Sequence, residues 1–159
     1  MKRITMTAGI LMLALIGVAS VGRAQGTVAR GPDPSTLRDT DLEKDSYHNL
    51  EVAQQYFKLK KAYVASLKRS EEIIAGNPNF AKIDQALYIA GMSSFYLSQN
   101  RGKQKVESIP AKERLSGDQY REEARVHLSQ LANDHPESSF SKLAADVLRE
   151  LGGPLPKGQ

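Results

Sequence analysis

The spacing of residues before two prolines, Pro78 and Pro136, constrains the fold of this chain more than any other feature. The same order stands before each: a small residue twelve positions back, a small or aliphatic one eight back, and an aliphatic one five back. These residues are Ser66, Ser70 and Ile73 in the first case, and Ala124, Leu128 and Leu131 in the second. Proline cannot continue a helix, and small residues let two helices approach closely. The pattern predicts a helix–turn–helix unit that is used twice.

Elsewhere between residues 41 and 152 the apolar residues also recur at helical spacing, and no stretch shows the alternating pattern typical of strands. We expect five helices: about 41–59, 62–75 and 82–99, a fourth that starts near Asp118 and is ended by Asn133 and Pro136, and a fifth over 140–151. Ser116 or Asp118 can cap the fourth, and Gly76 is expected to take a left-handed conformation after the second. The fifth has the most regular apolar spacing, and we expect its inward residues to be Phe140, Leu143, Ala144, Val147, Leu148 and Leu151.

Residues 1–24 have the pattern of a secretory signal peptide. Lys2 and Arg3 precede an apolar run, and the small residues Gly22 and Ala24 suit cleavage before Gln25. A cut after Ser20 is a second option. The apolar run, 8–21, is shorter than the roughly 18 to 20 residues that span a bilayer, so an uncleaved anchor is the less favoured alternative. We expect an exported protein of the bacterial periplasm or the periplasmic face of the outer membrane.

Loss of this segment changes the charge balance. Without Lys2, Arg3 and Arg23 the number of Lys and Arg residues falls from 22 to 19, against 18 acidic residues. The near-neutral remainder gives no reason to expect a nucleic-acid partner. The chain also has no cysteine, which excludes disulfides and a lipid anchor on an N-terminal cysteine.

Three further segments follow from composition. Residues 25–40 are rich in Gly, Pro, Thr, Asp and Arg and are expected to form a flexible linker. Residues 153–159 are expected to form a disordered tail. Residues 41–152 form the predicted helical domain, interrupted by a polar loop insertion at 100–117 that is longer than ordinary helix connections.

Two longer segments resemble one known family. They are AQQYFKLKKAYVASLKRSEEIIAGNPNFAKIDQALYIAGMSSFYL and YREEARVHLSQLANDHPESSFSKLAADVL. Both are similar to the C-terminal half of BamD, the tetratricopeptide lipoprotein of the outer-membrane β-barrel assembly machinery. The resemblance covers about residues 50–151. Two features differ from the family: there is no cysteine to lipidate, and there is room for two repeats where the family has about five.

The resemblance implies an all-α fold, a short tetratricopeptide-like solenoid of about five helices, built from two helix–turn–helix repeats and a closing helix. It also implies a protein that binds protein and assists outer-membrane protein assembly. Two repeats bury less surface than such arrays usually need. We therefore expect the first helix to leave an apolar edge that a partner, such as an envelope or barrel-assembly component, or a second copy of the chain covers.

In tetratricopeptide proteins the first helix of each repeat lines a concave groove that holds a peptide or a partner helix. The resemblance places eight residues of this chain there: His48, Glu51, Gln55, Lys58, Tyr88, Met92, Phe95 and Tyr96. The first four are a polar set, and the last four form an apolar stripe on the third helix. The alternative is that the third helix is the central helix of the domain and is covered on both sides.

A basic segment, KLKKAYVASLKR, supplies five cations and no acidic residue: Lys58, Lys60, Lys61, Lys68 and Arg69. An acidic partner or anionic head groups could bind here. The alternative is a solvated junction between two helices.

Catalytic motifs are lacking in the sequence. Of the histidines His48, His127 and His135, the last two are more than two helical turns apart, too far to share a metal on one helix. We expect no enzyme activity, no cofactor and no metal. Two alternatives stay open: a stand-alone periplasmic repeat scaffold in another envelope complex, and an enzyme with an unrecognised site.

Overall fold

The computed structural model describes residues 40–104 and 106–157, so the predicted signal peptide (1–24) and nearly all of the predicted linker (25–40) lie outside the described residues. The described part is all-α, as predicted, with five α-helices and no strand. They are α1 (Thr40–Gln54), α2 (Tyr63–Gly76), α3 (Ile83–Ser98), α4 (Gly117–Asp134) and α5 (Ser141–Glu150). A π-helix, η2 (Gln55–Lys60), prolongs α1 to the predicted end of the first helix, and a short 3₁₀ helix, η3 (Val106–Ser108), lies in the loop before α4.

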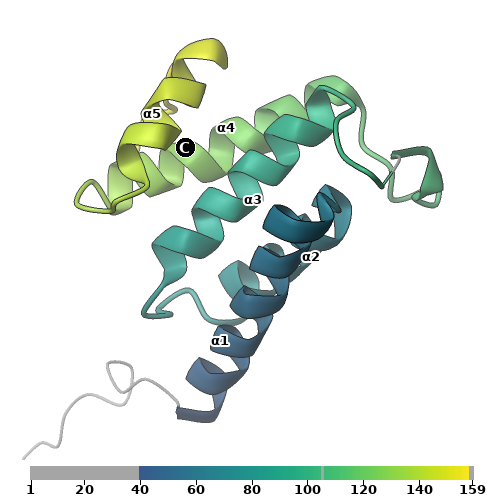
Figure 1. Ribbon diagram of the computed structural model, residues 1–159. Coiled ribbons are helices and arrows are strands. Elements are labelled where there is room, and N and C mark those ends of the chain that lie inside the picture. Colours follow the sequence, from purple (N-terminus) through teal and green to yellow (C-terminus); the bar gives the residue numbers. More distant parts are fainter. Residues whose placement is uncertain (1–39, 105, 158–159) are drawn as a thin grey trace, which may run out of the picture.

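The helices pack in chain order. The main contacts join α1 to α2, α2 to α3, α3 to α4 and α4 to α5 (Figure 1). In this view α3 crosses the middle of the molecule, with α1 and α2 on one side and α5 on the other. None of the described helices is both long enough and apolar enough to cross a membrane.

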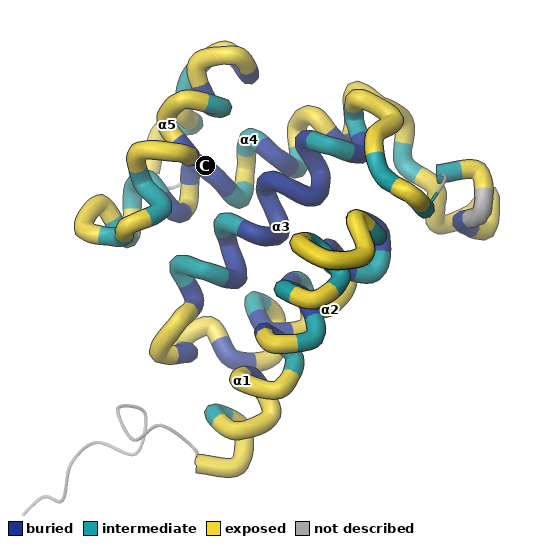
Figure 2. The backbone as a smooth tube through the Cα atoms, in the orientation of Figure 1, coloured by how far each residue is buried: buried dark blue, intermediate teal, exposed yellow. Residues whose placement is uncertain are grey.

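The third helix is the centre of the core. Eleven of the sixteen residues of α3 are buried, because the helix is apolar on more than one side and has neighbours on both (Figure 2). Two apolar clusters meet along it. The larger contains Leu87 of α3 with Leu128 and Leu131 of α4, and the smaller contains Tyr63 of α2 and Leu97 of α3.

Small residues bring the helices of each pair close together. Ser66 of α2 is fully buried, and its hydroxyl donates a hydrogen bond to the backbone oxygen of Ala53 in α1 at 3.0 Å. In the second pair, a Cβ at Gly91 of α3 would lie 2.6 Å from Cγ of Leu128 in α4. Ala124 of α4 is also fully buried. The small residues before the two prolines therefore coincide with two close helix–helix contacts.

The turn after α2 is fastened to α1. The buried Asn77 amide donates hydrogen bonds to Ser46 Oγ at 3.1 Å and to a carboxylate oxygen of Glu43 at 3.3 Å. The other oxygen of Glu43 accepts the N–H of Ala81 at 3.0 Å. The left-handed conformation predicted for Gly76 is wrong: Gly76 ends α2 in helical conformation, and the chain turns away at Asn77, where φ is −140°. With its side chain anchored on α1, Asn77 makes this exit without a positive φ.

The last two helices confirm one prediction and correct another. Ser116 caps α4 in a reciprocal capping box, in which Ser116 Oγ accepts the N–H of Gln119 and the Gln119 side chain accepts the N–H of Ser116. Leu143, predicted to point inward, is 50% exposed. Its helix, α5, has its main contact with α4. Ala144, Leu148 and Leu151 are buried, and Phe140 and Val147 are partly buried against the same cluster, so the buried stripe is narrower than predicted.

The predicted loop insertion packs against the start of α2. The N–H of Lys103 donates to the backbone oxygen of Lys61 at 2.9 Å, and the N–H of Ala65 donates to the Gln104 side chain at 3.3 Å. Ile109 of the loop is buried in the smaller apolar cluster. The loop thus closes one end of the core.

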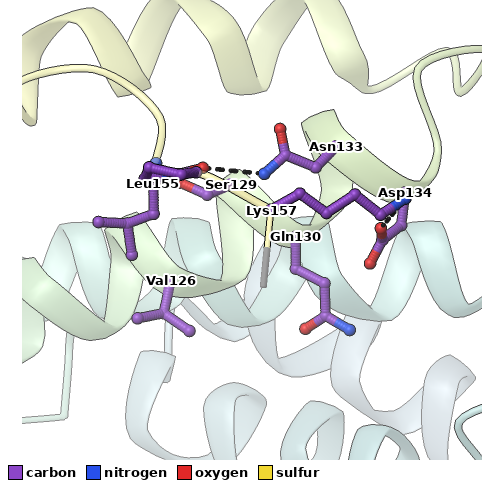
Figure 3. Close-up of a pocket in the computed structure, with 8 residues that line it drawn as sticks. Val126, Ser129, Gln130, Asn133, Asp134, Leu155 and Lys157 are labelled. Atoms are coloured by element: carbon purple, nitrogen blue, oxygen red, sulfur yellow. Dashed lines mark hydrogen bonds and ion pairs between the residues drawn. The ribbon is translucent and has the colours of Figure 1, made fainter. Parts of the chain in front are cut away.

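Residues 153–157 differ from the predicted disordered tail, because polar side chains of α4 hold their backbone. The N–H of Leu155 donates to Ser129 Oγ at 2.8 Å, and the Asn133 amide donates to the Leu155 oxygen at 2.9 Å. The Lys157 ammonium pairs with Asp134 at 3.0 Å. Figure 3 shows this segment lying along α4.

Candidate functional site

The four polar residues of the predicted groove are all exposed. His48 and Glu51 lie on α1, and Gln55 and Lys58 lie on η2. His48 and Glu51 line an open groove of about 570 Å³ between α1 and the beginning of α3. The structure therefore brings half of the polar set to one groove and leaves Gln55 and Lys58 outside its lining.

The rest of this groove, called here the α1 groove, combines aromatic, amide and charged side chains. Its other lining residues are Tyr47, Leu50 and Gln54 from α1, with Lys82 and Gln85 at the beginning of α3. Tyr47 is 43% exposed, and its ring packs edge-to-face with that of Phe80, with the ring centroids 4.9 Å apart. An exposed ring held by a buried one is a rigid apolar contact among polar groups, which suits recognition of a peptide.

The apolar stripe of α3 is largely covered by the chain itself. Met92 and Phe95 are each only 6% exposed and belong to the larger core cluster. Tyr88 is half-buried and stacks on Phe140, just before α5, with the ring centroids 4.8 Å apart. Tyr96 is half-buried and stacks on Phe57. Of the four stripe residues, only Tyr88 and Tyr96 retain a substantial exposed surface.

A carboxylate pair that the sequence reasoning missed lies under the loop insertion. Glu71 of α2 and Glu123 of α4 line a small pocket of about 170 Å³, together with apolar residues of α2, α4 and the loop. The pKa of Glu71 is raised to about 7, chiefly by burial and also by the charge of Glu123, while Lys68 opposes the shift. Such a pair can hold a proton near neutral pH. No spacing in the sequence reveals it, because its members lie on different helices.

Glu123 has its own electrostatic environment. Burial raises the pKa of its carboxyl, and the hydrogen bond from Ser94 Oγ, 3.3 Å away, opposes the rise. One helical turn further along α4, burial lowers the pKa of His127 to about 4. His127 Nδ1 is buried without a hydrogen-bond partner among the described residues. The imidazole is therefore neutral at pH 7, and it lies one helical turn from a carboxyl whose pKa is raised.

Two other cavities lie at helix ends. A groove of about 540 Å³ separates the two proline turns, where Ser138 Oγ donates to Asp84 at 2.7 Å. A cavity of about 220 Å³ lies between α4 and residues 155–157, lined by Val126, Gln130 and the residues that hold the tail (Figure 3). Part of that cavity is closed by the backbone of the tail.

The predicted basic segment divides into two parts. Lys68 pairs with Glu113 at 3.0 Å, and Arg69 pairs with Glu72 at 2.7 Å. Lys58, Lys60 and Lys61 are exposed, and within the described part of the chain they form no ion pair.

In residues 40–104 and 106–157 no three His, Cys, Asp or Glu side chains gather in a way that could hold a metal ion. Comparisons with protein-family models, with curated proteins and with solved structures gave no match.

Proposed function

We propose that this chain is an exported, non-catalytic protein-binding module of tetratricopeptide type, and that it holds a segment of a partner protein in the α1 groove. The observation that carries this proposal is the groove itself. It is open, it has a fixed and exposed aromatic ring, and amide and charged side chains surround that ring. These are the features of a surface that binds an extended peptide or a helix.

The distribution of exposed apolar residues supports the same surface. Five large hydrophobic residues of the described chain are strongly exposed, and two of them, Leu42 and Tyr47, lie on α1. The first helix packs mainly against α2, with a smaller contact to α3, and no described helix precedes it. These exposed residues support the proposal that α1 presents an apolar edge to a partner or to a second copy.

The resemblance to BamD supports a more specific version, in which the partner belongs to the outer-membrane protein assembly machinery. The alternative is a stand-alone periplasmic scaffold in another envelope complex. The carboxylate pair is the one observation that favours an enzyme, since perturbed pKa values gather at catalytic sites. Its pocket of about 170 Å³ is smaller than the roughly 300 to 1,000 Å³ of most ligand sites, so we propose binding rather than catalysis.

A pull-down from bacterial envelope extracts tests the function. The tagged chain is compared with Glu51→Lys in the α1 groove and with Glu150→Lys at the end of α5, which changes the net charge equally. We expect the wild type and Glu150→Lys to recover the same protein, and Glu51→Lys to lose it. Recovery of barrel-assembly components favours the BamD-like version, and recovery of another envelope complex favours the scaffold. Equal recovery by all three forms contradicts the α1 groove.

A further inference from the structure

One corner of the molecule gathers cations that no acidic residue offsets. The sequence has no Asp or Glu between Glu51 and Glu71, and none between Asp84 and Glu107. The cationic residues of these two stretches that form the corner are all exposed. They are Lys58, Lys60, Lys61, Arg101 and Lys103, and they are called here the basic corner.

Backbone contacts bring the two stretches together. Lys103 N–H donates to the backbone oxygen of Lys61 at 2.9 Å. Gly102 makes this approach possible, because its φ is +112° and a Cβ there would lie 2.9 Å from the Lys61 oxygen. Tyr63 at the beginning of α2 and Tyr96 near the end of α3 pack with their rings 4.8 Å apart. The clustering of the cations is therefore fixed by the fold.

The charges of the basic corner are free to act on a partner. Within the described residues none of its five cations forms an ion pair. Two are held over aromatic faces: the Lys60 ammonium lies 4.8 Å from the centre of the Tyr56 ring, and the Arg101 guanidinium lies 4.5 Å from that of Tyr96. Such contacts orient a cation and leave its charge in place.

An apolar residue stands among these cations. Leu59 is 76% exposed, more than any other large hydrophobic residue of the described chain, and it lies between Lys58 and Lys60. A nucleic acid or a run of acidic residues offers no apolar surface that could bury this leucine. A lipid surface can take the leucine into the acyl boundary while the lysines stay among the head groups.

We propose that the basic corner docks on an anionic phospholipid surface, with Leu59 inserted and the five cations in contact with head-group phosphates. Clusters of four to eight Lys or Arg residues on one surface are typical of such binding, and each cation strengthens it roughly fivefold. The corner lies on η2, at Lys61 directly after it and in the loop that follows α3, beyond the lining of the α1 groove. The proposal therefore does not depend on the proposed function.

Co-sedimentation of the full chain with vesicles tests this. One set of vesicles contains phosphatidylglycerol with phosphatidylcholine, and the other contains phosphatidylcholine alone. Residues 1–39 are the same in the wild type and in every variant, so differences between these forms measure the contribution of the basic corner. Lys60→Glu combined with Lys103→Glu should reduce binding to the anionic vesicles by about tenfold or more. Lys44→Glu combined with Lys142→Glu, with the same net charge, should keep it within about threefold.

Leu59→Ser separates a lipid surface from other polyanions. Loss of an inserted leucine should weaken binding to the anionic vesicles roughly tenfold and leave binding to soluble polyglutamate unchanged. Equal losses in the two double variants would overturn the basic corner. Full vesicle binding by Leu59→Ser, or tighter binding of polyglutamate than of vesicles, would overturn the lipid surface and favour an acidic protein. Thermal melting by circular dichroism confirms that each surface variant is folded.

Discussion

Gly91 of α3 and Leu128 of α4 lie so close that the leucine side chain occupies the place of a Cβ at Gly91, with Cγ at 2.6 Å and Cδ2 at 2.7 Å. Leu128 is fully buried, so its side chain has little room to move. This contact sets the distance between the two most extensively packed helices of the domain.

Gly91→Ala should therefore lower the free energy of unfolding by about 1 to 3 kcal/mol, the usual cost of overpacking a core. Gly76→Ala is the matched control, because Gly76 is also helical and a Cβ there meets nothing within 4 Å. This control should be neutral or more stable by up to about 1 kcal/mol. Urea denaturation of both variants measures the difference, and equal stabilities would contradict the close contact.

Glu71→Gln should change how stability depends on pH. The folded pKa of Glu71, about 7, is above its ordinary value of 4.5, so the folded state holds the proton more tightly than the unfolded state does. The stability that protonated Glu71 contributes to the folded state is thus fully present below pH 4.5 and is lost as the pH rises to about 7. The free energy of unfolding of Glu71→Gln, measured relative to that of the wild type, should rise by about 1 to 2 kcal/mol across that range, after allowance for solvent screening. Urea denaturation from pH 4 to 8 checks this, and a constant difference would contradict a buried proton.

His127→Gln should act in the opposite direction. The folded pKa of His127, about 4, lies below its ordinary value of 6.5, so the unfolded state binds the proton more tightly. The wild type therefore loses stability as the pH falls from 6.5 to 4, by about 2 kcal/mol from this residue. The same urea series on His127→Gln should lack this loss. If the variant and the wild type fall in parallel, the imidazole is not buried in its neutral form.

Tyr88 and Phe140 should be energetically coupled. Their stacked rings join α3 to the residue before α5, at 4.8 Å between the ring centroids. A double-mutant cycle with Tyr88→Ala and Phe140→Ala should give a coupling of about 0.5 to 1.5 kcal/mol, typical of aromatic pairs. A coupling of zero would show that Tyr88 does not hold α5, and would leave its ring available to a partner.

Much of the fold could be predicted from the sequence, because local signals set the helix boundaries. Pro78, Pro136 and Ser116 fixed helix ends to within a few residues, and the apolar period of α3 indicated its central place. The spacing could not show how wide the buried face of α5 is, because that width depends on the helix that packs against it. Leu143 was misplaced for this reason.

The candidate site was harder to predict. Spacing along one helix places His48 and Glu51 on the same face, but the α1 groove also needs Lys82 and Gln85 from another helix. Burial of the α3 stripe depends on side chains such as Phe140 that reach it from elsewhere. The carboxylate pair likewise comes from two helices, α2 and α4, whose residues line one pocket together with the loop. Contacts between elements that are distant in the sequence leave no periodic signal.

Site-specific photo-crosslinking in bacteria that export the chain shows whether the α1 groove holds a partner protein. A photoreactive amino acid replaces His48 in the α1 groove in one form and Ala145 on the exposed face of α5 in another. If the α1 groove binds protein, position 48 should give a discrete crosslinked protein, or a crosslinked dimer of the chain, and position 145 should not. Crosslinks of equal yield at both positions, or none at position 48, would contradict an α1 groove that binds protein.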